Sequence, residues 1–197
     1  MNKQSLELQT PVYPVPVLII GCYDANGRAN AVAASWGGVC CSVPPCIAIS
    51  VQKLRYSYKC IRDRGAFTVN IASEDQVAQA DLFGLFSGRD YDKFRETGLT
   101  TERGTFVDAP LVVECPISIE CRVTHTLELG SHVQFVGEVL RSWADPSVLD
   151  GNGLPDPLKV RPLVFMPKYG TYYGIGRPVG KAYSEARKYL GSSGRGV

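Results

Sequence analysis

The stretch Ile117-Ser-Ile-Glu-Cys-Arg-Val-Thr-His-Thr-Leu127 decides the fold, because hydrophobic and polar residues alternate along it. Alternation of period two places one set of side chains on each face of a β-strand. We therefore predict a half-buried strand whose polar set, Ser118 and Glu120 included, faces away from the core. Leu129-Gly130 follows as a turn, and Ser131 to Trp143 completes an antiparallel pair.

Shorter strand patterns lie on both sides of this pair. A hairpin is predicted from Pro14 to Tyr23, through the Asn26-Gly27 turn, to a second arm from Ala29 to Gly38. Further strands are predicted at Cys46 to Val51, Ala66 to Ile71 and Pro162 to Met166.

Helical spacing recurs between these strands. A short helix is predicted over Arg55 to Arg64, ended by Gly65, and a second one from the capping box at Ser73 to about Gly84. A helical turn is expected at Tyr91 to Glu96, and a closing helix at Gly180 to Leu190. Residues 191–197 are expected to form a flexible tail.

Together, about seven short strands with helices inserted between them favour a mainly β fold, a closed or partly closed antiparallel barrel, over alternating βαβ units. The 197 residues fit one domain over 1–197, with a core of about 14–190. The sequence contains no internal repeat.

Composition excludes several classes of function. A net charge of +2 gives no reason to expect nucleic acid as a partner. No apolar stretch approaches the length of a membrane helix and the first ten residues lack a signal-peptide pattern, so a cytoplasmic location is expected. The seven cysteines support neither a disulfide framework nor a zinc site, and Cys40-Cys41 is interpreted as small apolar filler, with redox activity as the alternative.

Common catalytic motifs are also missing. The chain has no Gly-x-Gly-x-x-Gly after its first strand, no P-loop and no Gly-x-Ser-x-Gly elbow. Two histidines are too few for most metal or triad designs, and no metal site is predicted. A redox reaction catalysed by this chain would require a bound cofactor.

Several segments occur in an order that resembles a known family. They are Asn30-Ala-Val-Ala-Ala-Ser-Trp36, Pro44-Pro45, Lys53-Leu-Arg-Tyr-Ser57, Tyr91-Asp-Lys-Phe94, Ser131-His132 and Gly137-Glu-Val139. Together they resemble the flavin reductase-like FMN-binding split barrel, and most closely its flavoredoxin branch. The resemblance spans roughly Pro14 to Lys188. It implies a Greek-key split β-barrel, bound FMN and a homodimer.

Lys53, Arg55 and Ser57 cluster at the first turn of a predicted helix. Free backbone N–H groups and the positive end of the helix dipole favour an anion there, and two cations with a hydroxyl would complete a phosphate site. The alternative is that both cations are solvated and Ser57 is only a cap.

The Asn30 to Trp36 strand could hold a flat ring. Small residues at Ala31, Ala33 and Ala34 leave the main chain open to close approach, Asn30 and Ser35 add polarity, and Trp36 adds an aromatic wall. The alternative is tight sheet packing with Trp36 in the core. The cofactor site predicted with the family also includes Val32, Ser50, Val51 and Tyr56.

The two histidines are expected to differ. His125 shares the apolar set of Ile119 and Val123 and is interpreted as a core or interface residue. His132 lies next to a turn, and the resemblance implies that it reaches the flavin or the nicotinamide, which makes it the predicted catalytic residue. A solvent-exposed turn histidine is the alternative.

Two further residues are assigned by resemblance. Lys93, otherwise a surface lysine, would contact the flavin across the dimer and stabilise the anionic reduced form. Phe165 would pack on the ring, although core packing is the usual role of such a residue.

Three functions remain open from sequence. The first is a reductase that passes hydride from NADH or NADPH to FMN and electrons on to an acceptor. The second is a flavoredoxin-type carrier that receives electrons from a redox protein partner. The third is a non-catalytic flavin-binding dimer.

Overall fold

The computed structural model of the chain describes residues 2–7, 10–182, 184–185 and 189. Seven strands form the main antiparallel sheet, in the order β3-β2-β6-β9-β10-β5-β4. Their bounds are Leu18–Tyr23 (β2), Ala29–Ala34 (β3), Gly37–Ser42 (β4), Pro45–Gln52 (β5), Ala66–Ile71 (β6), Ile117–Leu129 (β9) and His132–Ala144 (β10). The mainly β fold with a large antiparallel sheet is thus confirmed.

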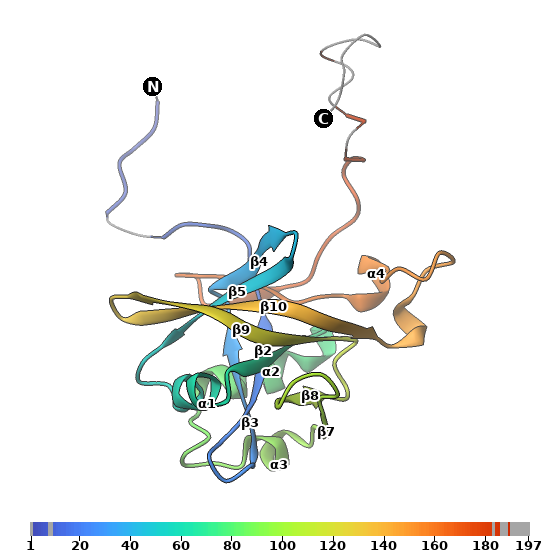
Figure 1. Cartoon of the computed structure of the whole chain (residues 1–197). Coiled ribbons are helices and arrows are strands. Elements are labelled where there is room, and N and C mark those ends of the chain that lie inside the picture. The colour runs from blue at the N-terminus through green and yellow to red at the C-terminus, as the bar shows by residue number, and fades with distance from the viewer. Residues whose placement is uncertain (1, 8–9, 183, 186–188, 190–197) are drawn as a thin grey trace.

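The prediction of one hairpin strand from Ala29 to Gly38 is wrong, because this segment belongs to two strands. β3 ends at Ala34, and β4 starts at Gly37 on the opposite edge of the sheet. Ser35 and Trp36 make the connection, and the Trp36 carbonyl accepts a 2.7 Å bond from the Ser50 N–H, which ties the connection to β5. In Figure 1, β4 and β5 lie above the long β9–β10 pair while β2 and β3 cross below it.

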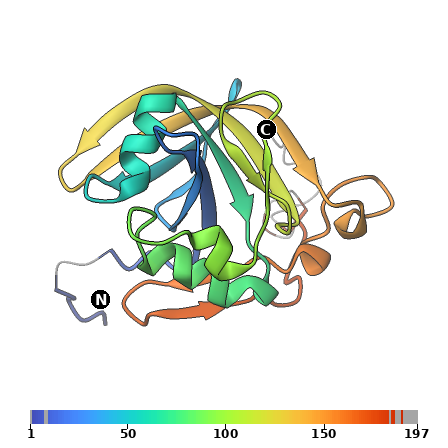
Figure 2. The same ribbon diagram turned by 90° about the horizontal axis from the view of Figure 1, so that it is seen from below.

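Small sheets and helices complete the body. β1 (Val15–Pro16), β11 (Val164–Met166) and β12 (Thr171–Tyr173) form one sheet, and β7 (Thr101–Arg103) pairs with β8 (Pro110–Val112). The helices are α1 (Tyr56–Arg64), α2 (Val77–Leu85), α3 (Lys93–Thr97) and α4 (Pro157–Val160), with 3-10 turns η1 (Glu74–Gln76) and η2 (Pro146–Val148). Figure 2 shows α2 and α3 beside β11 and β12, with α1 on the opposite side of the view from these two strands.

Local signals set the helix ends. Gly65 adopts the left-handed conformation (φ 62°) that closes α1, and Gly98 does the same after α3. Ser73 and Gln76 form the predicted capping box, with η1 as the first turn before α2. Five residues of the predicted closing helix at 180–190, namely 183, 186–188 and 190, and the whole tail at 191–197 lie outside the described residues.

Two hydrophobic clusters fill the interior. One lies between the main sheet and α1 and includes Phe67 and Phe135, and the other packs α2 and α3 against β2 and β3 through Phe83 and Phe94. Among the described residues, no helix is both long and apolar enough to cross a membrane.

The first part of the polar face of β9 is buried, which corrects the prediction for Ser118 and Glu120. The loop after β7 covers this face, and Glu120 is fully buried. Its carboxylate accepts bonds from the backbone N–H of Phe106 (2.6 Å) and Val107 (3.0 Å) and from Trp143 Nε1 (2.8 Å). The far end of β9 is instead open, so His125 is exposed and the core interpretation of it is wrong.

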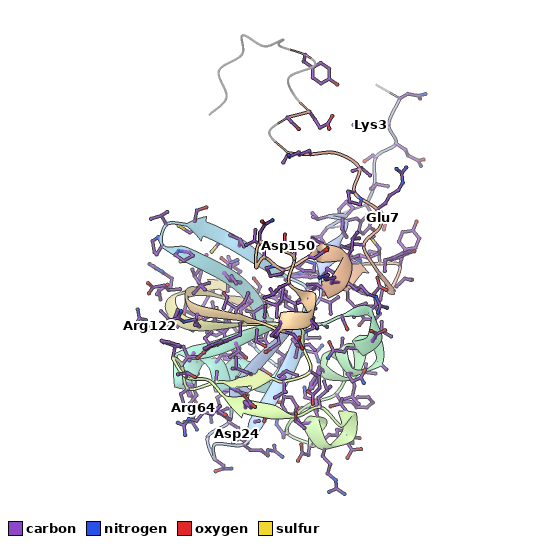
Figure 3. The ribbon with its side chains drawn as sticks, turned by 90° about the vertical axis from the view of Figure 1, so that its right-hand side faces the viewer. Lys3, Glu7, Asp24, Arg64, Arg122 and Asp150 are labelled. Carbon is purple, nitrogen blue, oxygen red and sulfur yellow. The ribbon has the colours of Figure 1, made fainter. Side chains whose placement is uncertain are left out.

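One end of the barrel is fixed by a side-chain network at the β2–β3 turn. The Asp24 carboxylate accepts bonds from the backbone N–H of Asn26 and Arg28, both 2.9 Å, and from the Tyr56 hydroxyl (3.1 Å). Arg64, at the end of α1, donates a 2.6 Å bond to the Asp24 carbonyl. Figure 3 shows Asp24 and Arg64 together at this end, opposite the N-terminal segment that carries Lys3 and Glu7. The network holds the start of α1 next to the end of β2.

Candidate functional site

Two adjoining cavities lie where β3 faces β5. They share Val32, Gln52, Arg55 and Leu85. The larger, the strand cavity, has a volume of about 390 Å³ and extends along β3 to Trp36, Phe165 and Tyr172. The smaller, the helix cavity, has a volume of about 270 Å³ and opens at the start of α1.

The first turn of α1 leaves hydrogen-bond donors free. Arg55 is the N-cap in an extended conformation, its side chain makes no cap bond, and the turn contains no acidic residue. The backbone N–H groups of Tyr56 and Ser57 have no acceptor among the described residues. A helix start of this kind favours an anion, through its free N–H groups and through the helix dipole.

Arg55 lies between the cavities and lines both. It is half-buried, and within the described part of the chain its guanidinium has no hydrogen-bond or ion-pair partner. A half-buried cation without a counter-ion is costly to maintain, so its position favours an external anion.

Lys93 supplies a second cation to the helix cavity. It is only 4% exposed, and its Nζ donates to the carbonyl oxygens of Phe83 (3.3 Å) and Phe86 (3.1 Å). Burial, together with the nearby charge of Arg55, lowers the pKa of Lys93 to about 8. The helix cavity is lined by no carboxylate, so its potential is positive.

The strand cavity has flat, mostly apolar walls. Ala33 and Ala34 line one side, and Trp36, 41% exposed, stands at the end. Across from them the rings of Phe165 and Tyr172 pack 5.2 Å apart. Their arrangement is suited to a planar ligand approached by main-chain groups.

Polar groups at the edge of the strand cavity come from four elements, α2, β12, β10 and β5. The Tyr172 hydroxyl donates a 2.9 Å bond to Asp81 of α2, and burial together with this bond raises the pKa of Tyr172 to about 12. His132 begins β10 opposite Gln52, and its Nδ1 lies 2.9 Å from the Ser131 hydroxyl. Ser50 accepts a 3.5 Å bond from the side chain of Gln134.

Most of the predicted site residues line these cavities. The strand cavity contains Val32, Ala33, Ala34, Ser35, Trp36, Ser50, Val51, Arg55, His132 and Phe165, and the helix cavity contains Tyr56, Ser57 and Lys93. Three predicted residues line neither cavity. Asn30 and Ala31 are buried behind the wall, where Asn30 Nδ2 donates a 2.8 Å bond to Ser57 Oγ. Lys53 extends away and pairs with Glu128 at 2.6 Å.

Sequence reasoning missed several lining residues. Asp81, Gly84 and Leu85 come from α2, and Tyr172 comes from β12. The spacing of Asp81 and Leu85 by one helical turn shows that they share a face, but no local pattern indicates that this face meets β3. The described residues contain no cluster of three or more potential metal ligands.

Comparison with known proteins identifies the family. The model of the flavin reductase like domain matches residues 10–173. Flavoredoxin of Desulfovibrio vulgaris (Miyazaki F) superposes with a TM-score of 0.89 at 44% identity, covering 93% of this chain and 99% of that one. Flavoredoxin from Methanosarcina acetivorans gives a TM-score of 0.89 at 30% identity, covering 95% and 99%.

A sequence relative extends beyond the shared region. An uncharacterised protein of Aeropyrum pernix is 33% identical over 70% of this chain, which spans about half (53%) of that protein's length. The match to the family model over most of the chain, together with the flavoredoxin-like split barrel, shows that this chain belongs to the flavin reductase like domain family.

Proposed function

We propose that the two cavities together bind one FMN, with its phosphate in the helix cavity and its isoalloxazine ring in the strand cavity. One observation carries this proposal. The unpaired Arg55 and the free N–H groups of α1 stand at one end of a continuous site whose other end is flat and largely apolar.

The donors present fit a phosphate. Arg55 offers a planar fork that matches phosphate oxygens, and the N–H groups of Tyr56 and Ser57 add two neutral donors. Lys93 contributes charge from the opposite wall, while its bonds to two carbonyls hold the ammonium in place. Lys53 is not part of this proposed phosphate site, because Glu128 already pairs with it.

The walls of the strand cavity fit the ring. FMN, when bound, supplies the capacity to accept a hydride or single electrons. The residues of the chain position it: Ala33 and Ala34 present main-chain groups to the ring edge, while Trp36 and Phe165 confine the ring from the sides. His132, at the start of β10, is positioned to hydrogen-bond the ring or a nicotinamide next to it.

The binding mode has a direct test in the comparison of FMN with riboflavin, which lacks the phosphate. Charge-assisted bonds contribute about 1.5–3 kcal/mol, so FMN should bind roughly ten- to a hundredfold more tightly. Titration followed by flavin fluorescence measures both affinities. Equal affinities would show that the helix cavity holds no phosphate.

We infer that the bound flavin serves an oxidoreductase that accepts hydride from NADH or NADPH and passes electrons to an acceptor. Membership of the flavin reductase like domain family supports this reaction class. Anaerobic mixing of the FMN-loaded protein with each nicotinamide, followed by absorbance, tests the proposal. Bleaching of the flavin on the timescale of turnover is expected.

The 44% identity to a flavoredoxin favours a second candidate, an electron carrier that receives electrons from a protein partner. A carrier keeps its FMN through gel filtration and is bleached by a reduced redox protein but not by nicotinamide. The same anaerobic experiment therefore separates the two candidates.

We further propose that the functional unit is a homodimer. The strand cavity is open beside Trp36, and a ring bound there would stay in contact with water unless a second subunit covered it. Light scattering of the FMN-loaded protein should give twice the chain mass. A monomer that retains flavin would contradict this assembly.

A further inference from the structure

The hairpin of β4 and β5 carries three of the seven cysteines, Cys40, Cys41 and Cys46. Cys40 and Cys41 are exposed, and the other five cysteines of the chain are buried. The interpretation of Cys40-Cys41 as apolar filler is therefore wrong. Thiols exposed to solvent do not pack in the hydrophobic core, so core packing does not explain Cys40 and Cys41.

Cys41 and Cys46 are direct cross-strand partners. The register of β4 and β5 pairs Ser42 with Pro45 and Cys41 with Cys46. Opposed residues in an antiparallel pair have Cα atoms about 4.5–5.5 Å apart, which lies within the range that a disulfide spans. Side chains opposed in this way lie on the same face of the sheet, so the two thiols are neighbours.

Cys40 provides an internal contrast. A register shift between Val39 and Cys41 leaves Cys40 without a directly opposed residue on β5. Like Cys41 it is exposed to solvent, but no cysteine is paired with it across the ladder. Cys40 and Cys41 therefore differ in their strand pairing and not in their exposure class.

The hairpin is open to small reagents. Figure 1 shows β4 and β5 projecting beyond the β9–β10 pair, and Val39 and Val43 on this hairpin are 80% and 89% exposed. The Cys41 thiol donates to the Val43 carbonyl at 3.4 Å and forms no disulfide. An oxidant can therefore reach Cys41 without unfolding the sheet.

We propose that Cys41 and Cys46 form a redox-active dithiol that closes to a cross-strand disulfide by exchange with a low-molecular-weight disulfide. The Cys41 thiolate attacks one sulfur of that disulfide, which forms a mixed disulfide and releases the first small thiolate. The Cys46 thiolate then attacks Cys41 sulfur, forms the Cys41–Cys46 bond and releases the second. The two cysteines lose two electrons and two protons, and the small disulfide is reduced to two thiols.

The order of attack follows from the surroundings of the two sulfurs. Burial raises the pKa of Cys46, and the neighbouring thiols of Cys41 and Cys40 and the carboxylate of Glu138 raise it further. A thiol with a raised pKa is a poor first nucleophile toward a reagent in solution. Cys46 needs only to reach the sulfur opposite, so its burial does not hinder the second step.

The test treats the reduced, FMN-loaded protein with glutathione disulfide, quenches the exchange with acid, denatures the protein in an excess of alkylating agent so that the buried thiols are also blocked, and maps the peptides by mass spectrometry. We expect a Cys41–Cys46 crosslink and a loss of two titratable thiols out of seven. Cys46→Ser should instead accumulate glutathione on Cys41, and Cys40→Ser should give the same crosslink as the original chain.

Three results would overturn the proposal. They are a crosslink between Cys40 and Cys41, stable glutathione on Cys41 despite an intact Cys46, and alkylation of both thiols after full exposure to the oxidant. Should Cys46→Ser fail to fold, the peptide maps of the original chain and of Cys40→Ser still decide between these outcomes.

Discussion

Two polar regions of the molecule differ in whether their charged groups have hydrogen-bond partners. Around Glu120, a fully buried carboxylate is matched by three donors, two from the backbone and one from Trp143. At the start of α1, the Arg55 guanidinium and two backbone N–H groups can donate hydrogen bonds but have no acceptor among the described residues. A satisfied buried charge holds the structure together, whereas an unsatisfied one indicates a place for a ligand.

The largest effect should come from removing the satisfied charge. Glu120→Ala removes a fully buried side chain and leaves three part-buried donors without their acceptor, so the free energy of unfolding should fall by roughly 3–5 kcal/mol. Urea denaturation monitored by Trp fluorescence measures the loss. Glu120→Gln keeps one acceptor oxygen and should lose less, and an equal loss in both variants would indicate that packing, not hydrogen bonding, dominates at this position.

The unsatisfied cation should show the reverse behaviour. Arg55→Ala is expected to weaken FMN binding by about 1.5–3 kcal/mol while changing the free energy of unfolding of the cofactor-free protein by less than about 0.5 kcal/mol. Fluorescence titration and urea denaturation measure the two quantities.

Lys53 is the matched control for Arg55, because it lies two residues away and carries the same charge but pairs with Glu128. Solvent screens an exposed pair of this kind, and Lys53→Ala should change FMN affinity by less than about threefold. If the two variants weaken FMN binding equally, long-range charge and not contact explains the anion preference.

Lys93 should make FMN binding depend on pH. Its pKa of about 8 in the free protein means that the ammonium is protonated below this pH and neutral above it. An anionic phosphate favours the protonated form, so affinity should be full below about pH 8 and fall by up to about tenfold as the pH rises above it. Titrations at a series of pH values measure the profile, and Lys93→Met should flatten it.

Folding of the cofactor-free protein should respond to pH in the other direction. The folded pKa of Lys93 lies below its unfolded value of 10.5, so the unfolded chain binds more protons between these values. The free energy of unfolding should therefore rise from about pH 8 to pH 10.5, and this rise should be absent in Lys93→Met. An unchanged profile in the variant would assign the pH dependence to another group.

The smallest effect is expected at Tyr172. Its hydroxyl is bonded to Asp81 at the edge of the strand cavity, where solvent competes for the same groups. Tyr172→Phe should lower the free energy of unfolding by about 1 kcal/mol or less and leave the difference between FMN and riboflavin affinities intact. A large change in that difference would place Tyr172 in the phosphate contact, contrary to its position in the strand cavity.

Sequence predicted those parts of the fold that local signals determine. Gly65 as a left-handed helix end and the capping box at Ser73 are properties of a few neighbouring residues, and both appear in the structure as predicted. The alternation at Ile117 to Leu127 gave the strand but not the burial of Glu120. A loop about fifteen residues earlier in the chain covers that face, and alternation contains no information about such a cover.

In the candidate site, too, some residues could be predicted from local sequence and others could not. Arg55 and Ser57 could be found because a helix start with cations is visible in the sequence. Lys53 was grouped with them by proximity in the chain, yet its partner is Glu128 in a strand more than seventy residues later. Asp81 and Tyr172 join the cavity only through long-range packing, which is why sequence reasoning missed them.

The order of strands has one last consequence. β3 and β4 follow one another in the chain but form the two free edges of the seven-stranded sheet, and only Ser35 and Trp36 join them. The strand cavity lies along this seam, with walls from β3 on one side and β5 on the other. A ligand bound there would contact β3 and β5 at the same time and so hold the two strands together. The backbone amide hydrogens of these strands should then exchange more slowly with deuterated water than in the empty protein.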